Sequence, residues 1–176
     1  MQIEKATLGN GCFWCTEAIF KQINGVIKVT SGYSGGHMNN PDYKSVCTGQ
    51  TGHAECLEIE YNAEIVKFED LLEVFWKTHD PTTLNQQGND IGTQYRSAIF
   101  TTTAEQMKVA QTSRDIYQSQ LNAQQIGEIV TEIVPSDGKT YWLAEEYHQK
   151  YLAKNPNGYD CHSSSGVVYP LTANVK

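Results

Sequence analysis

The sequence predicts an α+β fold in which helices cover a mixed sheet. Two patterns in the middle of the chain indicate this most directly. Residues 55–61 alternate between apolar and polar side chains, with Leu57, Ile59 and Tyr61 on one face, as expected of a strand with one buried face. Residues 67–78 instead repeat their apolar side chains at helical spacing. Strand-like and helix-like segments alternate along the rest of the chain, so both kinds of element belong to one fold.

The first half of the chain predicts short strands around one helix. Its elements are, in order, a strand at 4–8, a glycine turn at 9–11, a helix at 12–23, a strand at 26–31 and a glycine-rich loop at 32–36. The inner face of the helix carries Phe13, Ile19, Phe20 and Ile23. Gly25 ends this helix, because glycine readily adopts the left-handed conformation that follows a helix C-terminus.

The second half predicts further strands and helices in alternation. After the helix at 67–78, which Asp80-Pro81 stops, come a polar loop at 82–93, a strand at 95–101, a helix from 102 to about 122, a strand at 128–134, a turn at 135–138 and a helix at 141–154. Thr102 and Glu105 form a capping box at the start of the longest helix. The chain contains neither a repeat nor a linker, so we expect a single domain over 1–176, with a flexible, coil-rich tail at 156–176.

Composition and charge exclude several classes of protein. Hydrophobic residues are 39% of the 176 and charged residues 19%, as in ordinary globular domains. The 13 Lys and Arg residues against 20 Asp and Glu give a net charge of −7, which repels phosphate backbones and anionic lipid. We therefore expect neither nucleic acid nor a membrane as a partner. No apolar run is long enough for a signal peptide or a membrane span, which predicts a cytoplasmic protein.

Five cysteines in such a protein indicate reactive thiols or metal ligands rather than a disulfide framework. Cys12 follows a strand and a glycine turn and opens a helix, whose N-terminal N–H groups favour a thiolate. The alternative is an inert buried cysteine, but the flanking Gly9 and Gly11 permit close backbone approach and favour a functional thiol. Phe13-Trp14 follow directly and are able to wall an apolar pocket beside the sulfur.

Three other features carry potential chemistry. Glu55 stands at the start of a strand, where a half-buried carboxyl beside aromatic rings has a raised pKa and is able to donate a proton. A solvated surface charge is the alternative for this residue. The polar loop at 80–95 is longer than most connections, and such loops are often functional rather than tolerated insertions. Cys161 lies in the tail, where a mobile thiol can reach a second sulfur.

Three motifs occur in order along the chain. They are Gly11-Cys12-Phe13-Trp14, then Gly52-His53-Ala54-Glu55, then a run from His79-Asp80-Pro81-Thr82-Thr83 through Gln87-Gly88-Asn89-Asp90 to Gly92-Thr93-Gln94-Tyr95-Arg96-Ser97. Together they resemble the A-type peptide methionine sulfoxide reductases, over residues 9 to about 161. The resemblance implies a two-layer α/β sandwich with a mixed, largely antiparallel sheet.

The resemblance also implies a role for each matching residue. Cys12 matches the nucleophile, Phe13 and Trp14 the aromatic walls that receive the sulfoxide methyl group, Glu55 the proton donor to the sulfoxide oxygen, Tyr43 and Tyr95 the tyrosines that hydrogen-bond that oxygen, and Asp90 a polar residue of the same pocket. Protonation of the oxygen makes the sulfur electrophilic, and attack by Cys12 releases methionine and leaves a sulfenic acid. The implied substrate is the S epimer of methionine sulfoxide, free or in proteins. Thioredoxin is the implied reductant, and no metal or organic cofactor is required.

Two departures from the family pattern concern the cysteine that resolves the sulfenic acid. Cys15 stands where many members have glycine, and the tail offers one cysteine where some members have two. Side chains three apart on a helix have Cβ atoms about 5–6 Å apart, whereas a disulfide requires about 3.5–4.5 Å. We therefore expect Cys161 to resolve the sulfenate, with Cys15 as the alternative. The role of Cys47 stays open.

Three other functions compete with this interpretation. A thioredoxin-like oxidoreductase would use Cys12 and Cys15 as its redox pair, but it leaves Glu55 and the polar loop unexplained. A non-enzymatic zinc module would take its ligands from Cys12, Cys15, His53 and Cys56. A cysteine hydrolase would pair Cys12 with a histidine base, either His53 or His162.

Overall fold

One sheet forms the centre of the fold in the computed structural model, which describes residues 1–135 and 140–157. Within these ranges six strands lie in the order β7-β6-β1-β3-β2-β8. They are β1 (Ile3–Asn10), β2 (Val26–Ser34), β3 (Ala54–Asn62), β6 (Ser97–Phe100), β7 (Glu132–Val134) and β8 (Trp142–Leu143). Every neighbouring pair is antiparallel except β6 and β7, which are parallel. The mixed, largely antiparallel sheet confirms the expected α+β class.

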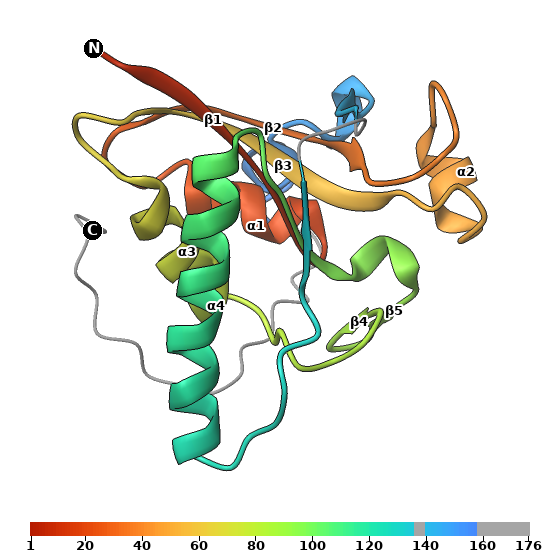
Figure 1. The fold of residues 1–176 in the computed structure, drawn as a ribbon. Helices are drawn as coiled ribbons and strands as arrows, with labels where there is room; N and C mark the ends of the chain where they lie inside the picture. Colours follow the sequence, from red (N-terminus) through yellow and green to blue (C-terminus); the bar gives the residue numbers. More distant parts are fainter. Residues whose placement is uncertain (136–139, 158–176) are drawn as a thin grey trace.

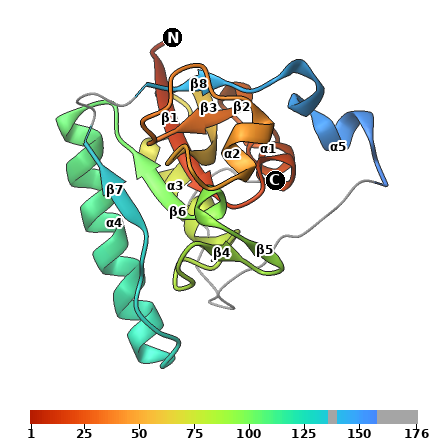
Figure 2. The ribbon, with the colours of Figure 1, turned by 90° about the vertical axis from the view of Figure 1, so that its right-hand side faces the viewer.

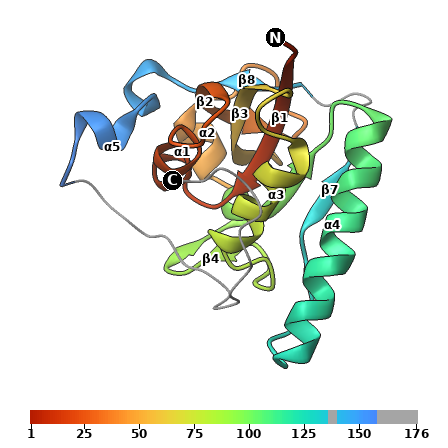
Figure 3. The same ribbon diagram turned by 90° about the vertical axis from the view of Figure 1, so that its left-hand side faces the viewer.

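Helices cover one face of this sheet (Figure 1). The three longest in the described ranges are α1 (Phe13–Phe20), α3 (Phe68–Lys77) and α4 (Ala104–Ala123). Their apolar faces share one core with β3, to which Leu57, Ile59 and Tyr61 contribute fully buried side chains. The predicted alternation of this strand is therefore confirmed. Figure 2 and Figure 3 show α4 alongside β7, at one edge of the molecule.

The opposite face of the sheet is more polar. It carries a smaller apolar cluster made of Ala54, Cys56, Ala98 and Phe100. Further along β3 the same face presents Glu58 and Glu60, and the ammonium group of Lys5 lies 2.9 and 3.5 Å from their carboxylates. These charges are partly exposed, so the two faces of β3 differ as the sequence pattern predicts.

The longest helix begins one residue later than predicted. Thr103, not Thr102, is the N-cap of α4, and its hydroxyl accepts a hydrogen bond of 3.1 Å from the backbone N–H of Gln106. The side-chain oxygen of Gln106 accepts from the N–H of Thr102, and its amide donates to the carbonyl of Lys5 on β1. The predicted pairing of Thr102 with Glu105 is therefore wrong, because Gln106 is the residue that connects the helix start to the sheet.

Four short elements lie in segments for which the sequence predicted no helix or strand, apart from Tyr95, which was predicted to begin a strand. Helix α2 (Tyr43–Cys47) begins at Asp42, whose carboxylate accepts from the N–H of Ser45 at 2.8 Å while the Ser45 hydroxyl accepts from the N–H of Asp42. The polar loop contains a hairpin of β4 (Gln86–Gln87) and β5 (Asp90–Ile91), followed by the 3-10 helix η1 (Thr93–Tyr95). All these elements are too short to show periodicity.

The helix predicted at 141–154 is wrong. Instead β8 is followed by the 3-10 helix η2 (Glu146–His148) and the single-turn helix α5 (Tyr151–Lys154). Long-range pairing determines this: β8 pairs with β2 at Gly32 and Tyr33, and the Gln149 amide exchanges two hydrogen bonds with the backbone of Ser31. Lys150 then adopts a left-handed conformation with φ of 54°.

The glycine-rich loop predicted at 32–36 is also corrected, because its first residues continue β2. A Cβ atom on Gly32 would lie 2.4 Å from the ring of Tyr141, so the glycine permits the close approach of the later segment. The tail predicted at 156–176 lies outside the described residues from 158 onward, and Cys161 with it. Among the described helices, none is both long and apolar enough to cross a membrane.

Candidate active site

Cys12 lies at the junction of β1 and α1, where it is the N-cap of the helix. Its carbonyl accepts the first helical hydrogen bond, from the N–H of Thr16 at 3.4 Å, and the residue is 7% exposed. Gly11 before it has a φ of +97°, and a Cβ atom there would lie 2.9 Å from Cγ of Gln87. Glycine is therefore needed both for the turn and for the polar loop to pack beside the thiol.

Glu55 on β3 lies next to this helix start. Its Oε1 accepts a hydrogen bond of 3.2 Å from the backbone N–H of Phe13, and the residue is 1% exposed. Burial raises the pKa of Glu55 to about 8; the Phe13 N–H opposes the shift, whereas the nearby Asp90 and Cys15 add to it. The carboxyl is therefore largely protonated at neutral pH, the state required of a proton donor.

Three other predicted residues converge on Glu55 from separate segments. Tyr43 is the first residue of α2, Tyr95 is the last residue of η1, and Asp90 is the first residue of β5. Burial raises the pKa of Tyr43 and of Tyr95, and the Glu55 carboxylate raises both further. The nearby Asp90 carboxylate also raises the pKa of Glu55 and of Tyr95. Both phenols therefore stay protonated at neutral pH and keep a hydroxyl that is able to donate a hydrogen bond.

Phe13 and Trp14 form the apolar side of the site. Phe13 is buried, with its ring centroid 5.8 Å from that of Tyr33, while Trp14 is half-buried. The indole of Trp14 stacks on Tyr151, with centroids 3.9 Å apart and planes 13° apart. Its Nε1–H donates a 2.9 Å hydrogen bond to Nδ1 of His148, which fixes the orientation of the indole.

Sequence reasoning did not find the residues behind this aromatic wall, namely Tyr33, Glu145, His148 and Tyr151. His148 is 1% exposed, and burial lowers its pKa against the opposing effect of Glu145. The available signal was the run Glu145-Glu146-Tyr147-His148, which combines carboxylates, a phenol and an imidazole. The incorrect helix prediction for this segment hid its relation to Trp14.

The remaining cysteines differ in their surroundings. Cys15 is buried in α1, two residues after the helix start. Cys56 is buried in the sheet, where burial strongly raises its pKa, so it is an unreactive thiol. Cys47 is exposed at the end of α2, and its thiol hydrogen-bonds Tyr43. The structure thus brings Cys15 and Cys47 near the site.

His53 is engaged in ways that disfavour two of the competing functions. Its Nδ1 accepts from the N–H of Gly36 at 3.1 Å, and its Nε2 lies 2.7 Å from the carbonyl of Met38. Both ring nitrogens are therefore occupied by backbone groups, so neither is available as a zinc ligand or a catalytic base. In residues 1–135 and 140–157, no three His, Cys, Asp or Glu side chains are grouped to hold a metal ion. His162 lies outside these ranges.

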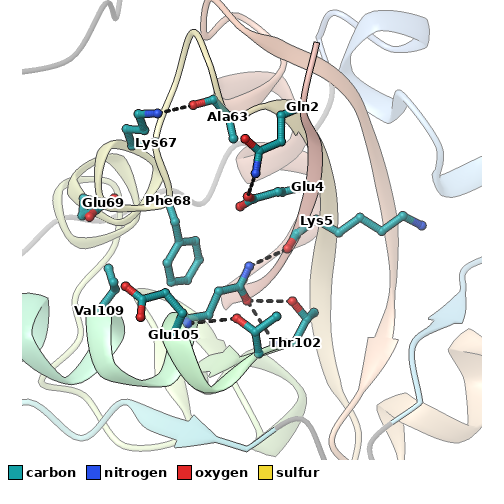
Figure 4. Close-up of a pocket in the computed structure, with 12 residues that line it drawn as sticks. Gln2, Glu4, Lys5, Ala63, Lys67, Phe68, Glu69, Thr102, Glu105 and Val109 are labelled. Atoms are coloured by element: carbon teal, nitrogen blue, oxygen red, sulfur yellow. Dashed lines mark hydrogen bonds between the residues drawn. The ribbon is translucent and has the colours of Figure 1, made fainter.

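A cavity in the described part of the chain lies away from Cys12, between the start of β1 and the starts of α3 and α4 (Figure 4). Its volume is about 550 Å³, and Glu4, Lys67 and Gln106 are among its lining residues. These polar groups already have partners: Glu4 accepts from Gln2 and Tyr61, Lys67 donates to the Ala63 carbonyl, and Gln106 binds the sheet. The polar groups of this cavity therefore do not indicate a catalytic or binding site.

Comparisons with known proteins agree with the motifs and the fold. The family model described as peptide methionine sulfoxide reductase matches residues 4–172. The peptide methionine sulfoxide reductase MsrA of Haloquadratum walsbyi is 53% identical over 158 residues, 90% of this chain and 87% of that protein. Methionine sulfoxide reductase A of Corynebacterium diphtheriae superposes with a TM-score of 0.86 at 41% identity, covering 94% of this chain and 81% of that one. Reduced Mxr1 from Saccharomyces cerevisiae superposes with a TM-score of 0.84 at 36% identity, covering 91% and 90%, and Mxr1 has also been solved in complex with Trx2. The chain belongs to the A-type peptide methionine sulfoxide reductase family.

Proposed function

We propose that this reductase converts methionine S-sulfoxide to methionine with Cys12 as the nucleophile and Glu55 as the proton donor. The observation that carries the proposal is the position of Glu55, whose carboxyl is buried, has a pKa of about 8 and binds the N–H next to Cys12. A neutral acid and a thiol at a helix start thus adjoin one another. This pair matches the two requirements of sulfoxide reduction, a proton for the oxygen and a nucleophile for the sulfur.

The proposed reaction balances without a cofactor. Glu55 donates its proton to the sulfoxide oxygen, and the phenols of Tyr43 and Tyr95 donate hydrogen bonds that stabilise charge on that oxygen. Sγ of Cys12, as the thiolate, attacks the sulfoxide sulfur, so that an Sγ–S bond forms while the S–O bond breaks and the protonated oxygen leaves as hydroxide. A water molecule then attacks Sγ, the Sγ–S bond breaks, and its electron pair leaves with the sulfur of methionine. The proton that this water releases neutralises the hydroxide, and Cys12 is left as a sulfenic acid. The methyl group of the substrate lies against Phe13 and Trp14.

A second thiol completes the proposed cycle. Its sulfur attacks the Cys12 sulfenic acid, water leaves, and a disulfide forms. We assign this step to Cys161, with Cys15 as the alternative. Thioredoxin then reduces the disulfide by thiol exchange; the complex of the yeast relative Mxr1 with Trx2 supports this choice of partner. Within the described residues Cys47 and Cys56 are free thiols, as is usual for proteins of a reducing compartment, and we propose the cytoplasm as the compartment of this protein.

The test of this proposal is a single turnover without reductant. The wild type should release about one methionine per chain and end as a disulfide, detected by mass spectrometry as the loss of two hydrogens, whereas Cys161→Ser should release the same amount and keep the sulfenic acid, detected as one added oxygen. Cys12→Ser should release none, whereas the control Cys56→Ala, on the opposite face of the sheet, should behave as the wild type. A Cys12→Ser rate above a tenth of the wild-type rate, about 1.4 kcal/mol of barrier, would exclude Cys12 as the sole nucleophile.

A further inference from the structure

The segment at 140–157 brings one carboxylate behind the sulfoxide pocket. Pairing of β8 with β2, together with the Gln149 bonds to Ser31, fixes this segment against the sheet. Glu145 lies between these two anchors. Its side chain is 31% exposed, so most of it lies inside the protein.

Glu145 connects three separate elements through its two oxygens. Oε1 accepts from the hydroxyl of Tyr33 on β2 at 3.0 Å, and Oε2 accepts from the backbone N–H of Tyr43 at 3.0 Å. Oε2 also accepts from the hydroxyl of Tyr147 at 3.2 Å and lies 3.9 Å from Nε2 of His148. Although burial opposes ionisation, these hydrogen bonds lower the pKa of Glu145. The carboxylate is therefore charged at neutral pH, and both of its oxygens accept hydrogen bonds from the protein.

The bond to Tyr43 matters most for the site. Tyr43 opens α2, a helix of five residues, and N–H groups in the first turn of a helix have no partner within it. The cap residue Asp42 binds the N–H of Ser45, so the Tyr43 N–H depends on Glu145. The phenol ring of Tyr43 packs against the imidazole of His148, with the two ring centroids 4.5 Å apart. The backbone from which the Tyr43 hydroxyl projects is thus fixed by a residue 102 positions away.

We propose that Glu145 is a positioning residue for sulfoxide reduction, which places the hydroxyl of Tyr43 by holding the backbone of that residue. The inference rests on the proposed function, in which this hydroxyl binds the sulfoxide oxygen. Glu145 does not touch the substrate. It acts on the rate through Tyr43, and not only on the stability of the fold.

A double-mutant cycle tests this inference. The proteins are the wild type, Glu145→Gln, Tyr43→Phe and the double variant, and the readout is the single-turnover rate of methionine release at saturating sulfoxide. Glutamine keeps the size of glutamate but turns one acceptor into a donor, so we expect Glu145→Gln to slow release about tenfold. On the Tyr43→Phe background the same change should slow it less than twofold, because the hydroxyl it positions is gone.

The control is Glu146→Gln, since the neighbouring Glu146 side chain is 90% exposed, and this variant should match the wild type. Melting temperatures of all proteins are measured in parallel, and rates are taken well below them. An equal slowing by Glu145→Gln on both backgrounds, or none on the wild-type background, overturns the inference while the proposed function stands. A Tyr43→Phe variant as fast as the wild type removes the role of Tyr43 and the inference with it. Failure of the proposed function itself would show differently, as absence of methionine release by the wild type.

Discussion

Replacing Glu55 by glutamine should remove both the proton and the pH dependence of the chemical step. Burial raises the pKa of this carboxyl from 4.5 to about 8. At pH 7 about 90% of it is then protonated, against about 0.3% for a solvated glutamate, a gain of about 300-fold in the acid form. Glutamine has a similar shape but no acidic proton. We expect Glu55→Gln to slow sulfenate formation by roughly 10²- to 10⁴-fold at pH 7.

The assay is a rapid-quench single turnover of methionine sulfoxide between pH 6 and pH 10, on the wild type and Glu55→Gln. The wild-type rate should fall above a midpoint of about 8, and its ratio to the variant rate should drop about fiftyfold from pH 8 to pH 10. Both proteins share the titration of Cys12, so the ratio isolates Glu55. An alkaline limb that persists in the variant, or a ratio that stays constant, would refute the assignment of Glu55 as the acid.

Unfolding measurements provide an independent check on the same pKa. The folded-state pKa of Glu55 is raised, so its contribution to stability is complete below the unfolded value of 4.5 and is lost as the pH rises toward 8. From pH 4.5 to pH 7 the free energy of unfolding of the wild type should fall, relative to Glu55→Gln, by roughly 3 kcal/mol. Parallel pH profiles in urea denaturation would contradict the raised pKa.

Two further predictions concern the resolving thiol and the turn before the nucleophile. Cys161→Ser should complete one turnover and accumulate the sulfenic acid but stall with thioredoxin as donor; normal turnover by this variant, with a stall in Cys15→Ser, would reverse the assignment. Gly11→Ala should lower the free energy of unfolding by about 1–3 kcal/mol in urea, because alanine is strained at a φ of +97° and its methyl group meets Gln87. Gly49→Ala is the matched control: its φ is +76° but its Cβ atom would meet only Oγ1 of Thr93, at an ordinary contact distance of 3.9 Å, so an equal loss there would show that the contact with Gln87 costs nothing.

The elements that the sequence predicted well are those with an apolar pattern of their own. β3 alternates and α3 repeats at helical spacing, and both bury the predicted faces. β1 and α1 also lie where they were predicted, although β1 continues into the predicted glycine turn as far as Asn10 and α1 ends at Phe20 rather than at Ile23. The junction between them was predicted correctly, and this is why the location of Cys12 could be predicted before the structure. The conformation of the segment at 140–157 could not be predicted, since it depends on pairing with β2, more than 100 residues earlier.

The residues of the site divide in the same way, into those that a local motif identifies and those that no local motif identifies. The motifs identified Cys12 and Glu55, and the structure places a hydrogen bond between Glu55 and the residue after Cys12. They did not identify His148 or Glu145, because these residues act through contacts that no local pattern encodes. The hydrogen bond from Trp14 to His148 joins residues 134 apart in sequence.

The most direct test of the account is the release of methionine from each separated epimer of methionine sulfoxide, with dithiothreitol as reductant. Dithiothreitol replaces thioredoxin, so the result depends on the site and not on the resolving cysteine. A site built around Cys12 and Glu55 should release methionine from the S epimer with the wild type, none from the R epimer, and none from either epimer with Cys12→Ser. Equal release from both epimers, or release by Cys12→Ser, would contradict a site built around Cys12 and Glu55.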